Sequence, residues 1–158
     1  MGKAIILMGS KGDLPHAERI KETLLRSFGI EATLRIASAH KTPEKVLEIV
    51  KGDVGDEVVF ITVAGRSNAL SGLVDAQTLR PVIACPPPSD RFGEADILSS
   101  LRMPSGVAPL VVLEPEAAAL AAAKILALKE KALEEKIREY QEKKREEVER
   151  ADEEVRGG

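Results

Sequence analysis

Aromatic residues are scarce in this chain. Phe, Trp and Tyr together make up 3% of the 158 residues, and tryptophan is absent. Because proteins that bind single-stranded nucleic acid stack the bases on aromatic side chains, this composition argues against such a partner. The formal net charge is −3, so the chain also lacks the basic field that attracts polyanions. We therefore expect no nucleic-acid partner.

Cysteine and histidine are also rare. The single cysteine, Cys85, cannot form an intrachain disulfide, which favours a reducing compartment. The two histidines, His16 and His40, do not stand at metal-ligand spacing with it, so we expect no metal site. Cys85 precedes three prolines and has no cation or histidine beside it in the sequence, which predicts a buried small residue and not a nucleophile. We expect His16 to lie at the surface.

The chain has no long hydrophobic run near its N-terminus. The run at residues 4–8 is too short for the apolar core of a signal peptide, and Gly9 and Ser10 follow it at once. We expect a cytoplasmic protein without a membrane partner.

Short apolar runs alternate with segments of helical periodicity. We expect strands at residues 4–8, 31–37, 58–64, 81–85 and 110–113, because these runs are apolar throughout or alternate with polar residues. The segments between them predict helices near residues 15–28, 43–50, 70–74, 95–101 and 115–128. Alternating strands and helices form right-handed βαβ units. The sequence thus predicts an α/β fold, a flavodoxin-like three-layer sandwich with a doubly wound parallel sheet of about five strands.

The C-terminal tail differs from the rest of the chain. Residues 129–156 are strongly helical in composition, with a narrow apolar stripe at nearly heptad spacing. A helix of this length cannot lie wholly on one small domain. It is either a solvated helix or an arm that packs on a neighbouring subunit. We favour the arm and hence a homo-oligomer, with residues 1–128 as a flavodoxin-like catalytic domain and residues 129–158 as a C-terminal helical arm.

Three polar or glycine-rich loops follow predicted strands at their carboxyl ends, where open parallel sheets bind ligands. The first resembles a phosphate cradle, because its glycines allow close backbone approach and a helix begins after it. We expect the three loops to meet at one crevice. Their candidate residues are Gly9, Ser10, Lys11, Gly12 and Asp13 in the first loop, Ser38, Ala39, His40 and Lys41 in the second, and Gly65, Arg66, Ser67 and Asn68 in the third.

The second loop contains the best candidate for proton transfer. His40 lies between small residues at the end of a strand, beside Lys41 and ahead of a Thr-Pro helix start. A histidine can act as an acid or a base near neutral pH, and a lysine can pair with an anion. Each loop residue taken alone also fits a simpler role, as a turn, a helix cap or a solvated charge. It is their convergence that favours a catalytic site with His40 at its centre.

Five motifs together resemble the aminoimidazole ribonucleotide (AIR) carboxylase and mutase family of purine biosynthesis. The likeness runs in order over residues 3–128. The motifs are Met8-Gly9-Ser10-Lys11-Gly12-Asp13, Ser38-Ala39-His40-Lys41-Thr42-Pro43, Ala64-Gly65-Arg66-Ser67-Asn68, Pro81-Val82-Ile83 and Met103-Pro104-Ser105-Gly106.

The resemblance implies a metal-free, cofactor-free enzyme that makes carboxyaminoimidazole ribonucleotide and assembles as an octamer of flavodoxin-like subunits. One branch of the family adds CO2 to aminoimidazole ribonucleotide, and the other moves a carboxylate within N-carboxyaminoimidazole ribonucleotide. Lys41, Arg66-Ser67-Asn68 and Pro104-Ser105-Gly106 resemble the direct carboxylase, which in animals is fused to a synthetase. The alternatives are the mutase and, outside the family, a flavodoxin-like nucleotide-binding module or a structural oligomer.

The resemblance also implies roles for individual residues. His40 would be the general acid and base, and Ser10 and Asp13 would hold the phosphate and ribose. Lys41, Ser67 and Asn68 would position CO2 and the new carboxylate. The family usually has serine where this chain has Gly12, so the backbone amide would replace that hydroxyl as a donor to the phosphate.

Overall fold

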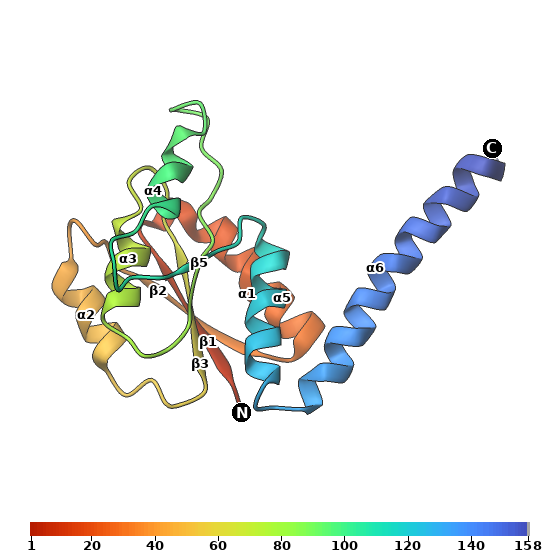
Figure 1. The fold of residues 1–158 in the computed structure, drawn as a ribbon, viewed down its shortest axis with the longest axis horizontal. Helices are drawn as coiled ribbons and strands as arrows, with labels where there is room; N and C mark the ends of the chain where they lie inside the picture. Colours follow the sequence, from red (N-terminus) through yellow and green to blue (C-terminus); the bar gives the residue numbers. More distant parts are fainter. Residues whose placement is uncertain (158) are drawn as a thin grey trace.

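Five parallel strands form one sheet at the centre of the computed structural model, which describes residues 1–157 (Figure 1). The strand order is β2-β1-β3-β4-β5, which is the flavodoxin-like order. The predicted fold class is confirmed. The strands are β1 (Lys3–Met8), β2 (Glu31–Ile36), β3 (Val58–Val63), β4 (Val82–Ala84) and β5 (Leu110–Val111).

Helices cover both faces of this sheet (Figure 1). Helices α1 (Leu14–Phe28) and α5 (Pro115–Ala127) pack on one face, and α2 (Pro43–Lys51) and α3 (Ala69–Ala76) pack on the other. The remaining helical segments are the 3-10 turns η1 (Lys11–Asp13) and η2 (Ala95–Ile97), the short α4 (Leu98–Leu101) and the long α6 (Ala132–Gly157).

The alternation of side chains along the strands divides the core into two layers. In β1, Ile6 and Met8 point into the layer with α1 and α5, whereas Ile5 and Leu7 point into the layer with α2 and α3. Every residue of β3 is buried, as expected for a central strand covered on both faces. The two layers fix the sheet rigidly beneath the loops at its carboxyl edge.

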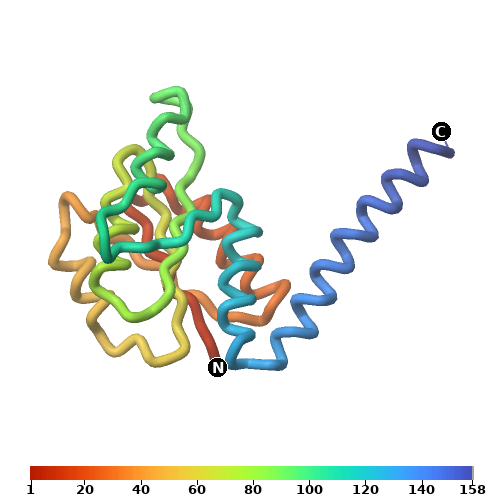
Figure 2. Tube along the Cα trace, in the orientation of Figure 1, coloured from red at the N-terminus to blue at the C-terminus, as the bar shows by residue number. Residues whose placement is uncertain are grey.

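The C-terminal helix α6 has a docked half and a projecting half. Leu133 is buried against the α1 and α5 layer, and the Tyr140 ring lies 5.1 Å from the Phe28 ring of α1, centroid to centroid. Residues 142–157 are exposed throughout and extend away from the domain (Figures 1 and 2). Within residues 1–157, no helix has both the length and the apolar character needed to cross a membrane.

The strand order reverses direction between β1 and β3, so the chain leaves these neighbouring strands toward opposite faces of the sheet. This arrangement opens a crevice at their carboxyl ends. Strands β4 and β5 are shorter than predicted. Pro86 and Pro87 follow β4 closely and lack the N–H groups that would continue the ladder.

Candidate active site

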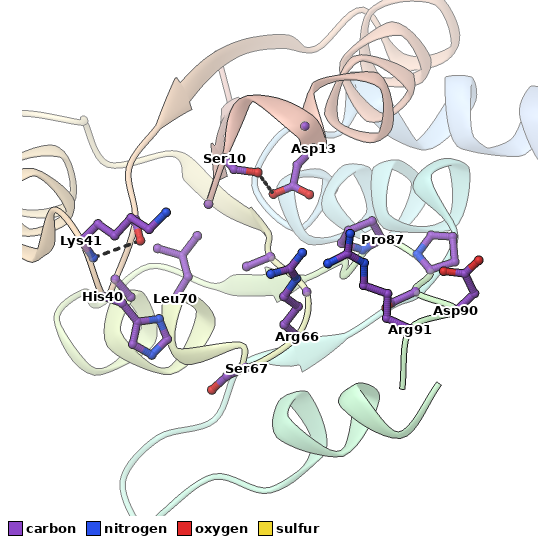
Figure 3. A pocket seen from close by; sticks show the side chains of 18 residues that line it. Ser10, Asp13, His40, Lys41, Arg66, Ser67, Leu70, Pro87, Asp90 and Arg91 are labelled. Atoms are coloured by element: carbon purple, nitrogen blue, oxygen red, sulfur yellow. Dashed lines mark hydrogen bonds between the residues drawn. The ribbon is translucent and has the colours of Figure 1, made fainter. Parts of the chain in front are cut away.

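A cavity of about 780 Å³ lies at the carboxyl edge of the sheet, a volume typical of small-molecule sites (Figure 3). The three predicted loops meet there. Of the residues that the sequence singles out, the cavity is lined by Gly9, Ser10, Gly12, Asp13, Ser38, Ala39, His40, Lys41, Gly65, Arg66 and Ser67. Lys11 and Asn68 do not line it. Lys11 is exposed in η1, and Asn68 is buried behind the third loop.

The first loop places a hydroxyl and a carboxylate together. The Ser10 hydroxyl donates to Oδ2 of Asp13 at 3.4 Å, and the Asp13 N–H donates to the Ser10 carbonyl at 3.2 Å. Asp13 occupies the N-cap position of α1 without making the side-chain bond of a cap, so its carboxylate remains directed at Ser10 and the cavity. Partial burial raises the pKa of the Asp13 carboxyl above its ordinary value, although the hydrogen bonds from Ser10 oppose this shift.

The second loop holds His40 in a closed turn. The Thr42 N–H donates to the Ser38 carbonyl at 2.8 Å, and the Ser38 N–H donates to the Thr42 hydroxyl at 2.9 Å. The Ser38 hydroxyl accepts from the Lys41 N–H at 3.1 Å. Thr42 is the N-cap residue of α2 by position, but its hydroxyl closes the turn and does not cap the helix. The backbone around His40 is thus fixed while its imidazole stays exposed.

The third loop has an unusual backbone. Arg66 has a φ of 58°, in the left-handed region that residues other than glycine rarely adopt. Figure 3 shows its side chain pointing into the cavity, toward the same side as Ser10 and Asp13. Behind it, the Asn68 side chain caps α3 by accepting from the Ser71 N–H at 3.2 Å. The third loop therefore presents Arg66 and Ser67 to the cavity and uses Asn68 for its own support.

A fourth loop, which sequence reasoning missed, completes the cavity. It follows β4 and contributes Pro87, Pro88, Ser89, Asp90 and Arg91. The rule that identified the other three loops also applies to this one, because it too follows the carboxyl end of a strand. The signal was present, but the run of prolines suggested only a stiff turn.

The charged side chains around the cavity have both signs. Lys41, Arg66 and Arg91 carry positive charge, and Asp13 and Asp90 carry negative charge. In Figure 3 the Arg66 and Arg91 side chains approach one another from different loops. Such a site suits a ligand with an anionic group and several hydroxyls, since cations hold the anion and carboxylates accept from the hydroxyls.

His16 lies beside Cys85 in the fold, on the far side of the proline loop from His40. Its Nε2 is 3.4 Å from the Cys85 Sγ, and burial lowers the pKa of the His16 imidazole below its ordinary value. The predicted surface position of His16 is therefore wrong. Cys85 is buried as predicted, and burial raises the pKa of its thiol to about 12. A neutral, buried thiol is not a nucleophile.

The part of the chain that the structure describes contains no group of three or more His, Cys, Asp and Glu side chains able to hold a metal ion. The side chains that line the cavity offer their own acid–base and hydrogen-bonding chemistry. They comprise one exposed imidazole, three cations, two carboxylates and the hydroxyls of Ser10, Ser38, Ser67 and Ser89.

The family model for AIR carboxylase matches residues 3–147. The chain belongs to the AIR carboxylase family. It is 64% identical to the phosphoribosylaminoimidazole carboxylase of Archaeoglobus fulgidus over 154 residues, which cover 98% of this chain and 85% of that one. The Treponema denticola protein of the same name is 56% identical over 129 residues, 80% of each chain. The AIR carboxylase family was thus correctly predicted from the five motifs.

Two further comparisons bear on the fold and on the length of the chain. The crystal structure of Treponema denticola PurE superposes with a TM-score of 0.94 at 48% identity, over 98% of this chain and 99% of that one. A bifunctional phosphoribosylaminoimidazole carboxylase and succinocarboxamide synthetase of Drosophila melanogaster is 44% identical over 97% of this chain, which covers 36% of that protein. Relatives of this chain thus occur both alone and joined to a second enzyme.

Proposed function

We propose that this AIR carboxylase family member joins CO2 directly to aminoimidazole ribonucleotide, with His40 as general acid and base. One observation carries the proposal. An exposed imidazole on a rigid turn faces a cavity that also holds a Ser10–Asp13 pair at a helix start and three cations. The names of the relatives, and the carboxylase-like residues Lys41 and Arg66, support CO2 over a carbamate as the donor.

The reaction requires one carbon–carbon bond to form and one carbon–hydrogen bond to break. The amino group makes the ring carbon beside it electron-rich, so that carbon attacks CO2 and briefly carries both its hydrogen and the new carboxylate. His40 then accepts the proton, and the electrons of the broken bond return to the ring. In the reverse direction the imidazolium gives the proton back. An exposed imidazole can also exchange this proton with solvent between turnovers.

The rest of the cavity binds and orients the two reactants. Ser10, the η1 backbone and Asp13 would hold the phosphate and ribose, because N–H groups at a helix start favour an anion. Lys41 and Ser67 would face CO2 and stabilise the carboxylate as its charge develops. Asn68, whose side chain is buried, would act by supporting the Ser67 loop and not by touching CO2. The remaining lining residues, Gly9, Ser38 and Gly65, supply backbone surface to this pocket.

Product formation from aminoimidazole ribonucleotide and bicarbonate tests the proposal. The same assay is run in parallel with N-carboxyaminoimidazole ribonucleotide as the substrate. We expect turnover from CO2 that does not require the carbamate. Turnover from the carbamate alone would assign the protein to the mutase branch and would contradict the role proposed for Lys41 and the Arg66 loop.

A serine at position 12 should strengthen substrate binding. A Cβ added at Gly12 would meet only the Ser10 hydroxyl, at 3.6 Å, so Gly12→Ser fits without displacing any neighbour. The added hydroxyl can donate to the phosphate, and one such bond contributes about 0.5–1.5 kcal/mol. We expect the KM for aminoimidazole ribonucleotide to fall by a factor of about two to ten with kcat unchanged. Gly12→Ala is the matched control, and an equal fall in KM for both variants would contradict the hydroxyl's role.

We also propose that the protein is a homo-octamer in the cytosol, with residues 129–158 as an arm on a neighbouring subunit. The projecting half of α6 supports the arm, because residues 142–157 touch nothing in their own subunit closely enough to be buried. The valines Val148 and Val155 are 69% and 81% exposed there, available to a partner chain. The single, unpaired Cys85 supports a reducing compartment.

A further inference from the structure

The loop that carries Arg66 is held from behind by a short segment 30 residues further along the chain. Oδ2 of Asp96, in η2, accepts a hydrogen bond from the Arg66 N–H at 3.1 Å. The Ser99 hydroxyl lies 3.2 Å from the Arg66 carbonyl oxygen and accepts from the Asn68 N–H at 2.9 Å. Both backbone groups of Arg66 are thus engaged by one segment, residues 96–99.

These bonds act at the point where the backbone is least favourable. Arg66 has a left-handed φ of 58°, which a side chain with a Cβ disfavours. Such a conformation persists only when its surroundings fix it. A carboxylate is a strong acceptor for a backbone N–H, because the hydrogen bond is assisted by its charge. Asp96 therefore supplies the contact best suited to hold Arg66 in this state.

Asp96 is placed where it can act only through Arg66. It lines a separate cavity of about 360 Å³ beside His16 and Glu114, and it is not among the residues that line the substrate cavity. Arg66, in contrast, lines the substrate cavity and points into it (Figure 3). The loop thus separates the carboxylate from the ligand it would help to bind.

A buried hydrogen-bond chain prevents the rest of the loop from compensating. The Asn68 Nδ2 donates to the Ser100 hydroxyl at 2.8 Å, and the Ser71 hydroxyl donates to the Asn68 Oδ1 at 2.9 Å. Ser71 in turn lies 2.6 Å from the Thr62 hydroxyl of β3. This chain fixes Asn68 to the sheet, so Arg66 is the freest residue of the loop once Asp96 is removed.

We infer that Asp96 is a positioning residue that, with Ser99, holds Arg66 in its left-handed conformation and so aims the guanidinium at the bound substrate. The orientation of Arg66 follows from the contacts alone. Its effect on turnover rests on the proposed function. In this role Asp96 neither touches the substrate nor exchanges a proton.

Activity measurements on Asp96 variants test this role. We expect Asp96→Ala to lower kcat/KM by about tenfold, mainly through KM, because Arg66 then samples orientations away from the substrate. Asp96→Asn keeps an oxygen acceptor at the same place, so we expect it to retain activity within about threefold of the parent. Equal losses in both variants would overturn the inference.

A double-mutant cycle locates the effect. Glycine adopts a left-handed φ without strain, so Arg66→Gly removes both the guanidinium and the need for an anchor. We expect Asp96→Ala to cause little further loss in the Arg66→Gly background. A full additional loss there would show that Asp96 acts elsewhere. Asp75→Ala is the matched control, because Asp75 likewise accepts from a remote backbone N–H, that of Ala108, but lines neither cavity.

Amide hydrogen exchange measures the anchor without any assay of turnover. We expect a peptide covering residues 65–68 to exchange faster in Asp96→Ala than in the parent or in Asp96→Asn, while a peptide from β3 stays protected. If the parent protein had no carboxylase activity, the proposed function would fail and this measurement would still decide the role of Asp96. Unchanged exchange in Asp96→Ala would overturn it.

Discussion

The His40→Asn variant should fold, bind aminoimidazole ribonucleotide and lose turnover by a factor of about 10²–10⁴, the usual contribution of a general acid or base. Asparagine is similar in size and polarity but cannot accept and return a proton near neutral pH. The His40 side chain is exposed, and its turn is closed by bonds between Ser38 and Thr42. The substitution therefore removes the proton carrier and leaves the backbone of the loop in place.

The second histidine of the chain provides the matched control for this variant. His16→Asn makes the same chemical change beside Cys85, outside the substrate cavity. We expect it to keep carboxylase activity within about threefold, with any loss appearing as lower thermal stability. The measurements are kcat for each variant and the Kd for the ribonucleotide. If His40→Asn turned over at the rate of the parent, another group would be the acid and base.

Most of the fold was predictable because local sequence and tertiary structure agree. The run at residues 58–64 is apolar almost throughout, and its strand lies in the middle of the sheet with every residue buried. Helix α1 buries Ala17, Ile20, Leu24 and Phe28 at helical spacing and ends at Gly29, whose φ of 66° suits a glycine. Patterns of this kind report directly which face of an element meets the core.

The site was predictable as far as the rule for parallel sheets reaches. That rule brings together loops at the carboxyl ends of strands, and the first three loops do share one cavity. The sequence does not tell which side chains of a loop face the ligand. Asn68 and Ser67 are neighbours of similar polarity, yet Asn68 is buried and Ser67 lines the cavity. Their difference depends on Ser71 and Ser100, which meet Asn68 only in the fold.

Contacts between distant segments account for what sequence reasoning missed. His16 and Cys85 are 69 residues apart, and no spacing rule predicts that their side chains meet. Asp96 and Arg66 likewise come from different loops. A left-handed residue is predicted from sequence only when it is glycine, so the backbone of Arg66 gave no signal. Such features depend on how α4 and its preceding turn pack against the third loop.

Truncating α6 at two positions should separate assembly from stability. Ending the chain after Gln141 removes the exposed half of the helix, and we expect the mass measured by light scattering to fall from that of an octamer to that of a smaller species. The domain should stay folded, because residues 142–157 bury nothing in their own subunit. An unchanged mass would remove the projecting half of α6 from the interface.

Ending the chain after Lys131 should also destabilise the domain itself. This truncation removes Leu133, which is 4% exposed, and Tyr140, which covers Phe28. Burying a leucine contributes about 1.5–3 kcal/mol and a partly buried aromatic adds to it, so we expect the free energy of unfolding to drop by about 3–5 kcal/mol. The proper reference is the chain ending after Gln141, because both truncated proteins lack the projecting half. Denaturant unfolding compares them, and equal midpoints would mean that the docked half of α6 does not stabilise the α1 and α5 layer.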